Sequence, residues 1–167
     1  MHVFKNNGAL PKVDVYRELK GQLAALFADE RSGVANAGNM AALLYQSLPD
    51  LNWAGFYFVQ EGGLVLGPFQ GKVACARIAL GRGVCGTAAK ALKTVIVPDV
   101  SLFPGHIACD ASSRSEIVVP LLQKGRLLGV LDLDSPKLSR FDREDSRGLG
   151  KAVKLLVESS DFGWLGE

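Results

Sequence analysis

Cysteine and histidine are scarce in this 167-residue chain, which also lacks a block of like charge and a long apolar run. Its three cysteines are an odd number, so internal pairing cannot use them all, and a disulfide framework is disfavoured. No segment approaches the roughly 18 apolar residues of a membrane-spanning helix, and residues 1–8 lack the apolar core of a secretory signal. We therefore expect a soluble, cytoplasmic protein whose thiols are reactive, bind a metal or lie inert in the core.

The charge balance argues against two further classes of partner. The 19 Lys and Arg residues oppose 17 Asp and Glu residues, which leaves a net charge of +2 without a basic face. We therefore expect neither nucleic acid nor an anionic membrane as the main partner. A composition that is 48% hydrophobic and 22% charged suits a soluble protein with a substantial core. We expect a single domain over residues 1–167, with residues 1–12 as a loose lead-in.

The periodicity of apolar residues predicts helices at both ends of the chain and antiparallel hairpins between them. The expected helices cover 14–28, 33–48, 84–92 and a last segment that begins after Asp142. The expected strands cover 51–60, 64–70, part of 74–80, 94–97, 115–122 and 126–134. Ser32 and Asp142 are expected as N-caps, because their side chains can accept a hydrogen bond from the first helical turn. The order of elements indicates an α+β domain with helices packed on a sheet.

The turn between the last two strands decides where their carboxylates point. A three-residue loop with Gly125 in the left-handed conformation sets Glu116 opposite Asp132, whereas a two-residue loop sends these two side chains to different faces. We prefer the three-residue loop, because it gathers one apolar face from Ile117, Val119, Leu121, Leu127, Leu131 and Leu133. Glu116, Asp132 and Asp134 then share the opposite face.

Residues 81–86 match the GxGxxG pattern of dinucleotide-binding sites and open a predicted helix. That pattern needs alternating parallel strands and helices around it, whereas this chain shows antiparallel hairpins. The segment is better interpreted as a structural turn and helix start.

The three cysteines lie in two parts of the chain, with Cys75 and Cys85 upstream and Cys109 near His106. A zinc site built from these four residues has spacings of C-x9-C and H-x2-C, unlike the short paired knuckles of structural zinc. A buried cysteine is more often a small hydrophobe, and Cys85, among glycine and alanine, fits this interpretation best. Cys109 lies in a polar loop, where a neighbouring cation lowers the pKa of a thiol and favours the thiolate.

Glu116, Asp132 and Asp134 form the second group of candidate residues. They are either a solvated face or, with Val118, Pro120, Leu128 and Val130 on the same face, carboxylates under partial cover. Carboxylates under cover repel one another, which raises at least one pKa and creates an ammonium site together with a proton donor. Trp53 and Tyr57 share one face of a strand, and are either core residues or the wall of a pocket for a small cation or methyl group.

Six ordered motifs between about Asp14 and Ser160, containing all three cysteines, resemble those of the free methionine-(R)-sulfoxide reductases, which are built on a GAF domain. The motifs are Asn52-Trp53-Ala54-Gly55-Phe56-Tyr57, Pro68-Phe69-Gln70-Gly71-Lys72-Val73-Ala74-Cys75, Gly81-Arg82-Gly83-Val84-Cys85-Gly86-Thr87, Gly105-His106-Ile107-Ala108-Cys109-Asp110, Ser115-Glu116-Ile117-Val118 and Gly129-Val130-Leu131-Asp132-Leu133-Asp134-Ser135.

The resemblance implies a six-stranded antiparallel sheet with helices on both sides, commonly in a homodimer. It implies that Cys109 is the catalytic thiol, Cys75 the resolving thiol and Cys85 an auxiliary one. It assigns substrate binding to three carboxylates and an aromatic wall: Glu116, Asp132, Asp134, Trp53 and Tyr57. It also implies thioredoxin as reductant, and no metal or bound cofactor.

The residues therefore leave three hypotheses. The first is a reductase that acts on free methionine (R)-sulfoxide. The second is a GAF-type sensor that binds a small ligand without turnover, and the third is a module stabilised by zinc. Replacing Cys109 with serine distinguishes them, because it abolishes turnover in the first, changes little in the second and releases metal in the third.

Overall fold

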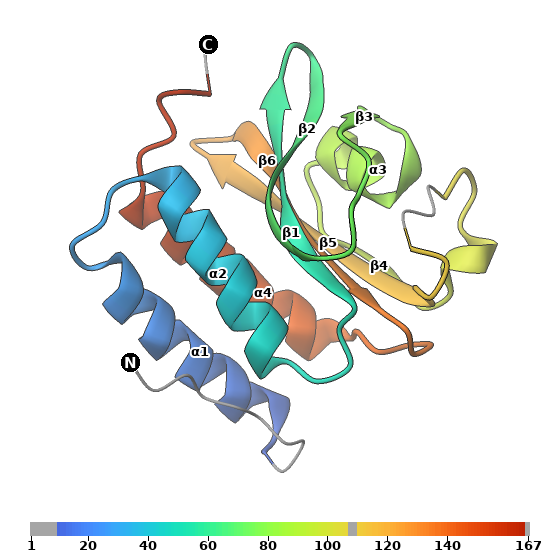
Figure 1. Ribbon diagram of the computed structural model, residues 1–167, viewed down its shortest axis with the longest axis horizontal. Helices are drawn as coiled ribbons and strands as arrows, with labels where there is room; N and C mark the ends of the chain where they lie inside the picture. The colour runs from blue at the N-terminus through green and yellow to red at the C-terminus, as the bar shows by residue number, and fades with distance from the viewer. Residues whose placement is uncertain (1–9, 107–109, 166–167) are drawn as a thin grey trace.

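The computed structural model describes residues 10–106 and 110–165, which fold into four α-helices, one 3-10 turn and six strands (Figure 1). The helices are α1 (Lys12–Phe27), α2 (Gly33–Ser47), α3 (Gly83–Ala91) and α4 (Arg143–Ser159), and the 3-10 turn η1 covers Val100–Leu102. The strands are β1 (Trp53–Gln60), β2 (Gly63–Gly71), β3 (Arg77–Ala79), β4 (Val95–Val97), β5 (Ser115–Gln123) and β6 (Arg126–Ser135). They form one antiparallel sheet in the order β3-β2-β1-β6-β5-β4, which confirms the expected α+β class.

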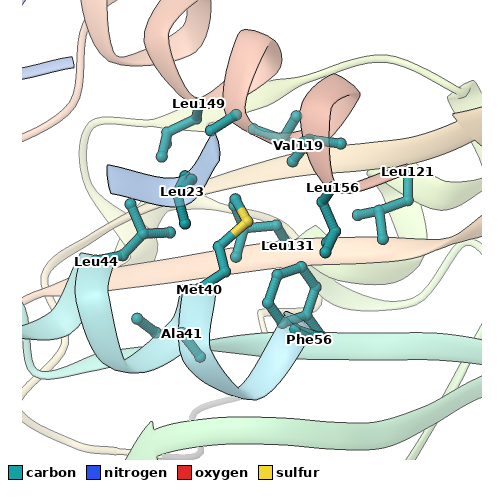
Figure 2. Close-up of a cluster of buried hydrophobic side chains, with 14 of the residues drawn as sticks. Leu23, Met40, Ala41, Leu44, Phe56, Val119, Leu121, Leu131, Leu149 and Leu156 are labelled. Carbon is teal, nitrogen blue, oxygen red and sulfur yellow. The ribbon is translucent and has the colours of Figure 1, made fainter. Parts of the chain in front are cut away.

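Helices α2 and α4 cover one face of the sheet, α1 packs against these two helices, and α3 lies against the other face (Figure 1). The larger hydrophobic core lies under the three long helices. Figure 2 shows Leu23, Met40 and Leu44 of the helices meeting Phe56 and Leu131 of the sheet. Helical spacing of these side chains puts them on one stripe of each helix, and burying that stripe drives the helices onto the sheet.

The predicted helix starts are confirmed. The Ser32 hydroxyl accepts a hydrogen bond from the Ala35 N–H at 3.3 Å and caps α2. The Asp142 side chain caps α4 by accepting hydrogen bonds from the N–H groups of Glu144 and Asp145. The Asp145 carboxylate in turn accepts a hydrogen bond from the Asp142 N–H. This reciprocal capping box fixes where α4 begins.

Strand β1 divides its side chains between the two faces, as its alternation predicts. Ala54, Phe56 and Phe58 lie in the large core, whereas Trp53 and Tyr57 lie in the smaller cluster beneath α3. The smaller cluster is therefore built around aromatic rings on the face that also carries the carboxylates.

The predicted register of the β5–β6 hairpin is wrong, although the shared face of the carboxylates is right. Gln123 pairs with Arg126, so the loop has two residues, Lys124 and Gly125, both with positive φ. A bulge beside Leu121 then shifts the register by one residue, and Glu116 pairs with Asp134 rather than Asp132.

The bulge also exchanges two leucines between the faces. Leu127 packs against the smaller cluster and Leu128 lies in the large core, the reverse of their expected positions. The two-residue turn and the bulge each shift the register by one residue in the same direction, so the total shift beyond the bulge is two residues, which keeps every side chain there on its expected face. Glu116, Asp132 and Asp134 therefore still share a face.

The glycine-rich segment before α3 is a structural turn, as interpreted from the sequence. Gly81 and Gly83 have φ of 82° and 60°, values that glycine adopts readily. A Cβ at Gly86 meets the Ala79 carbonyl oxygen at 2.4 Å, so the glycine lets α3 approach β3 closely. Within the described ranges no helix is long and apolar enough to cross a membrane.

Candidate active site

A pocket lies between α3, the sheet and the two loops that follow β2 and β4. It is partly enclosed and partly open to solvent. Its lining is mostly small apolar, aromatic or acidic: Trp53, Tyr57, Ala74, Ile78, Arg82, Gly83, Val84, Cys85, His106, Asp110, Ser113, Glu116, Asp132 and Asp134. The pocket thus suits a small molecule with one cationic end.

The acidic side of the pocket is contributed by neighbouring strands. Glu116 on β5 faces Asp134 on β6, and Asp132 lies two residues along the same face. Glu116 is 5% exposed and Asp132 6% exposed, and the Cys85 thiol donates a hydrogen bond to Asp132 Oδ2 at 3.3 Å. Asp132 Oδ1 is buried and has no hydrogen-bond partner among the described residues. An unpaired buried carboxylate oxygen costs free energy unless a ligand donates to it.

Burial is the main cause of the raised pKa values of the acidic groups in this site. It raises the pKa of Glu116, with the charge of Asp134 adding to the effect, and it raises that of Asp132, where Glu116 adds. The pKa of Asp134 is raised by burial and by Asp132. The Cys85 thiol also has a raised pKa, because it is buried and faces the same carboxylates. The empty pocket therefore favours protonated carboxyls, and a bound cation favours their ionised forms.

An aromatic wall on the neighbouring strand β1 lies beside the carboxylates, with Trp53 paired to Asp134. The rings of Trp53 and Tyr57 stack at 6.0 Å between centroids, and Trp53 also stacks on Phe69 at 5.4 Å. Trp53 Nε1 donates to the Lys72 carbonyl oxygen at 3.1 Å, and the Tyr57 hydroxyl donates to the Cys75 carbonyl oxygen at 3.0 Å. The wall thus anchors the β2–β3 loop that carries Cys75.

Asp110 joins the two loops at the pocket. Its carboxylate accepts hydrogen bonds from the Ser112 N–H at 2.9 Å and from Asn52 Nδ2 at 3.3 Å, and it pairs with Lys72 Nζ at 3.3 Å. These bonds, the Ser112 N–H first, lower the pKa of Asp110 to about 2. Asp110 therefore stays ionised and ties the β2–β3 loop to the segment that follows residue 109.

His106 lies at the opposite rim of the pocket, with Nε2 3.4 Å from Glu116 Oε2. Burial lowers the pKa of this imidazole below its ordinary value. Burial therefore disfavours the cationic form of this ring.

The fold and this pocket can now be compared with known proteins. The family model for the GAF domain matches residues 36–166. The chain is 52% identical to the free methionine-R-sulfoxide reductase of Escherichia coli, an alignment that covers 87% of this chain and 88% of that protein. It is 46% identical to the enzyme of that name from Saccharomyces cerevisiae, over 92% of this chain and 89% of that one. The chain belongs to the free methionine-R-sulfoxide reductase family of GAF domains.

A solved member of the free methionine-R-sulfoxide reductase family has the same architecture. The X-ray structure of the Neisseria meningitidis protein in complex with its substrate superimposes with a TM-score of 0.89 at 47% identity, covering 95% of each chain.

Most of the site residues expected from the sequence line the pocket described above. Trp53, Tyr57, Glu116, Asp132 and Asp134 all contribute to it. Cys85 does too, so it is buried as its sequence context indicated, but it also bonds to a carboxylate. Cys75 is partly buried and packs against the same cluster, next to the lining residue Ala74. Cys109 lies outside the described residues.

Three polar lining residues were not singled out as site residues from the sequence. Asp110 and Ser113 come from the loop before β5, and Arg82 from the glycine turn before α3. An Asp followed two residues later by Ser is a signal for a local turn bonded through the carboxylate, which indicates a fixed loop beside the histidine. The signal for Arg82 is its position between two glycines at a helix start.

Proposed function

We propose that the protein reduces free methionine (R)-sulfoxide to methionine. The observation that carries this proposal is a pocket that combines the buried carboxyls of Glu116 and Asp132 and the half-buried Asp134 with the neighbouring Trp53–Tyr57 wall, with one oxygen of Asp132 unpaired. The names of the E. coli and S. cerevisiae relatives and the substrate complex of the N. meningitidis protein support the same activity.

The carboxylates select a free amino acid because they require a cation. The α-ammonium of methionine sulfoxide donates to the carboxylates and stabilises their ionised forms. A peptide-bound residue presents a neutral amide instead, which leaves buried charge unpaired. The S-methyl group packs on the aromatic rings, which present a flat apolar surface.

The chemistry begins at Cys109. Its thiolate attacks the sulfoxide sulfur while a protonated carboxyl, Glu116 or Asp132, transfers a proton to the sulfoxide oxygen. The oxygen ends on Cys109 as a sulfenic acid and methionine leaves. The raised pKa of both carboxyls supports this role, because a proton donor must hold its proton near neutral pH.

Cys75 resolves the sulfenic acid. Its thiol sulfur bonds to the Cys109 sulfur, one water leaves, and a Cys75–Cys109 disulfide remains. The Lys72–Asp110 ion pair supports this pairing, since it links residues three before Cys75 and one after Cys109. Thioredoxin then reduces the disulfide through its own thiol pair. The raised pKa of Cys85 disfavours its thiolate, which supports an auxiliary role for this residue.

The assembly and location follow the family expectation. We infer a cytoplasmic homodimer that requires neither a metal nor a bound cofactor for turnover. Gel filtration with light scattering measures the mass of the assembly directly.

A single turnover without reductant tests the proposal. Reduced protein is mixed with free methionine sulfoxide, and the methionine formed and the thiols lost are counted. We expect about one methionine per chain and the loss of two thiols, since one disulfide forms for each substrate reduced.

Two variants and one substrate analogue control this experiment. Cys109→Ser forms no methionine yet still binds the sulfoxide, and Cys75→Ser forms methionine but retains a sulfenic acid that dimedone traps. N-acetylmethionine sulfoxide is not reduced, because its nitrogen is uncharged. If the unmodified protein forms no methionine and keeps three intact thiols, the reductase proposal is wrong. A ligand-binding GAF module is then the remaining hypothesis.

A further inference from the structure

One group in the pocket goes beyond the binding of an ammonium. Cys85, Glu116 and Asp132 are all buried, and one ligand atom from each lies within 4.8 Å of the other two. The set combines a soft sulfur with two hard carboxylate oxygens. Asp132 Oδ1 provides a further buried oxygen without a partner among the described residues.

The separations fit a tetrahedral metal. Zinc bonds of about 2.3 Å to sulfur and 2.0–2.2 Å to oxygen or nitrogen set neighbouring ligand atoms roughly 3.4–3.6 Å apart. Cys85 Sγ and Asp132 Oδ2 are 3.3 Å apart, and His106 Nε2 and Glu116 Oε2 are 3.4 Å apart. Both separations match one edge of a zinc tetrahedron. His106 is not among the three residues whose ligand atoms all lie within 4.8 Å of one another, so its imidazole must move from Glu116 toward Cys85 and Asp132 to supply the fourth ligand.

Without a metal, the burial of Glu116 and Asp132 costs free energy, and a bound cation reduces this cost. Within the described ranges, neither Glu116 nor Asp132 forms an ion pair with a lysine or arginine. A divalent cation that displaces the Cys85 proton compensates two of the three negative charges that the thiolate and the two carboxylates then carry. A thiolate together with an imidazole favours Zn²⁺ over Mg²⁺ or Ca²⁺, which prefer sites made of oxygen alone.

We propose that the pocket is also a zinc site, with Cys85, Glu116, Asp132 and His106 as ligands, and that zinc and the amino-acid substrate exclude one another. Ligation releases the Cys85 proton and the protons that Glu116 and Asp132 hold in the empty pocket, and no oxidation state changes. The exclusion rests on the proposed function, because it assumes that Glu116 and Asp132 hold the substrate. Zinc thereby inhibits the enzyme reversibly at its substrate site.

Cobalt is the probe for the binding arm, because a Co²⁺–thiolate bond has a charge-transfer absorption in the near ultraviolet. Reduced protein titrated with Co²⁺ should develop this band, and Zn²⁺ should abolish it while Mg²⁺ and Ca²⁺ do not. The band should be lost in Cys85→Ser and retained in Cys75→Ser and Cys109→Ser. A band that survives in Cys85→Ser, or that disappears in Cys109→Ser, overturns the assignment.

Two further variants keep the binding arm decisive if Cys85→Ser folds poorly. His106→Gln and Glu116→Gln should each weaken Co²⁺ binding by at least about tenfold, since each removes a ligand from the metal. Circular dichroism verifies the fold of each variant. Unchanged affinity in both variants contradicts the proposed ligand set.

The competition arm uses Cys109→Ser, which cannot turn substrate over. Free methionine sulfoxide should raise the apparent Co²⁺ dissociation constant in proportion to its concentration. Sulfoxide that binds the metal-free variant without shifting the titration overturns the shared site. Sulfoxide that does not bind at all contradicts the proposed reductase function, whereas the cobalt band still decides the metal site.

Discussion

Asp132 is the residue on which most of the pocket depends. It is buried, accepts a bond from Cys85, and lies beside a second buried carboxyl, Glu116, that adds to the rise in its pKa. A carboxylate in this position is costly without a ligand and valuable with one, since the ligand supplies the missing positive charge. Stability and substrate binding therefore place opposite demands on Asp132.

Replacing Asp132 with asparagine should stabilise the ligand-free protein at high pH. A pKa raised by folding means that the unfolded chain loses its proton first, so the native aspartate loses stability as the pH rises above the ordinary value of 3.8. Asp132→Asn removes that loss, and we expect about 1–4 kcal/mol more stability at pH 8, with the gain shrinking toward pH 4. Urea unfolding at both pH values measures it.

Asp110→Asn is the matched control, because its effect on stability should have the opposite sign. The pKa of Asp110 is lowered to about 2, so its contribution is present above the unfolded value and lost as the pH falls. Asp110→Asn should therefore be less stable than the unmodified protein at pH 8, a difference that disappears in acid. Equal pH profiles for the two variants contradict the assigned shifts.

Tyr57 links the aromatic wall to Cys75, the proposed resolving thiol. Its hydroxyl bonds to the Cys75 carbonyl oxygen, so Tyr57→Phe keeps the ring and removes this bond. We expect a loss of about 1 kcal/mol in stability, the net value of one hydrogen bond, and slower disulfide formation than methionine formation. Rapid-quench counting of methionine and thiols separates the two steps. Tyr45→Phe, which alters a tyrosine at the large core, should leave both rates unchanged.

Two glycines of α4 show how close the helices pack. A Cβ at Gly148 meets the ring of Tyr16 on α1 at 2.1 Å, whereas a Cβ at Gly150 meets nothing within 4 Å. Gly148→Ala should destabilise the fold by about 1–3 kcal/mol through overpacking. Gly150→Ala should stabilise it by about 0.5–1 kcal/mol, because alanine favours a helix. Thermal unfolding compares them, and equal shifts exclude a tight α1–α4 contact.

The helices and most strands were predictable because each carries its signal locally. Spacing of apolar residues marks α1, α2 and α4, Ser32 and Asp142 mark two helix starts, and alternation marks both faces of β1. These patterns depend only on neighbours in the sequence, so the sequence alone reveals them.

The hairpin register was not predictable because a distant strand decides it. The bulge lies beside Gly129, where a Cβ meets the Tyr57 carbonyl oxygen of β1 at 2.2 Å. A leucine pair followed by glycine does not reveal that contact without the sheet order. The common face of Glu116 and Asp132 was predicted correctly only because turn and bulge together shift the register by two residues, and a shift of two leaves each side chain on the same face.

At the scale of the whole molecule, the pocket draws on the sheet, α3 and two loops, so a ligand that fills it stabilises elements far apart in sequence. Its lining also contributes to the cluster that holds α3 on the sheet, and α3 contacts both β5 and β6. Substrate binding should therefore be coupled to global unfolding rather than to the movement of a single loop.

Ligand-linked unfolding of Cys109→Ser tests this coupling. Free methionine sulfoxide at one hundred times its dissociation constant should add about 2.7 kcal/mol, which corresponds to a rise in Tm of roughly 5–10 °C for a protein of this size. N-acetylmethionine sulfoxide should give almost no shift, because it leaves the buried carboxylates without a cation. Equal shifts for the two compounds contradict ammonium recognition. A shift seen in hydrogen exchange of the loops but not in Tm contradicts the coupling, because the pocket would then open without unfolding the sheet.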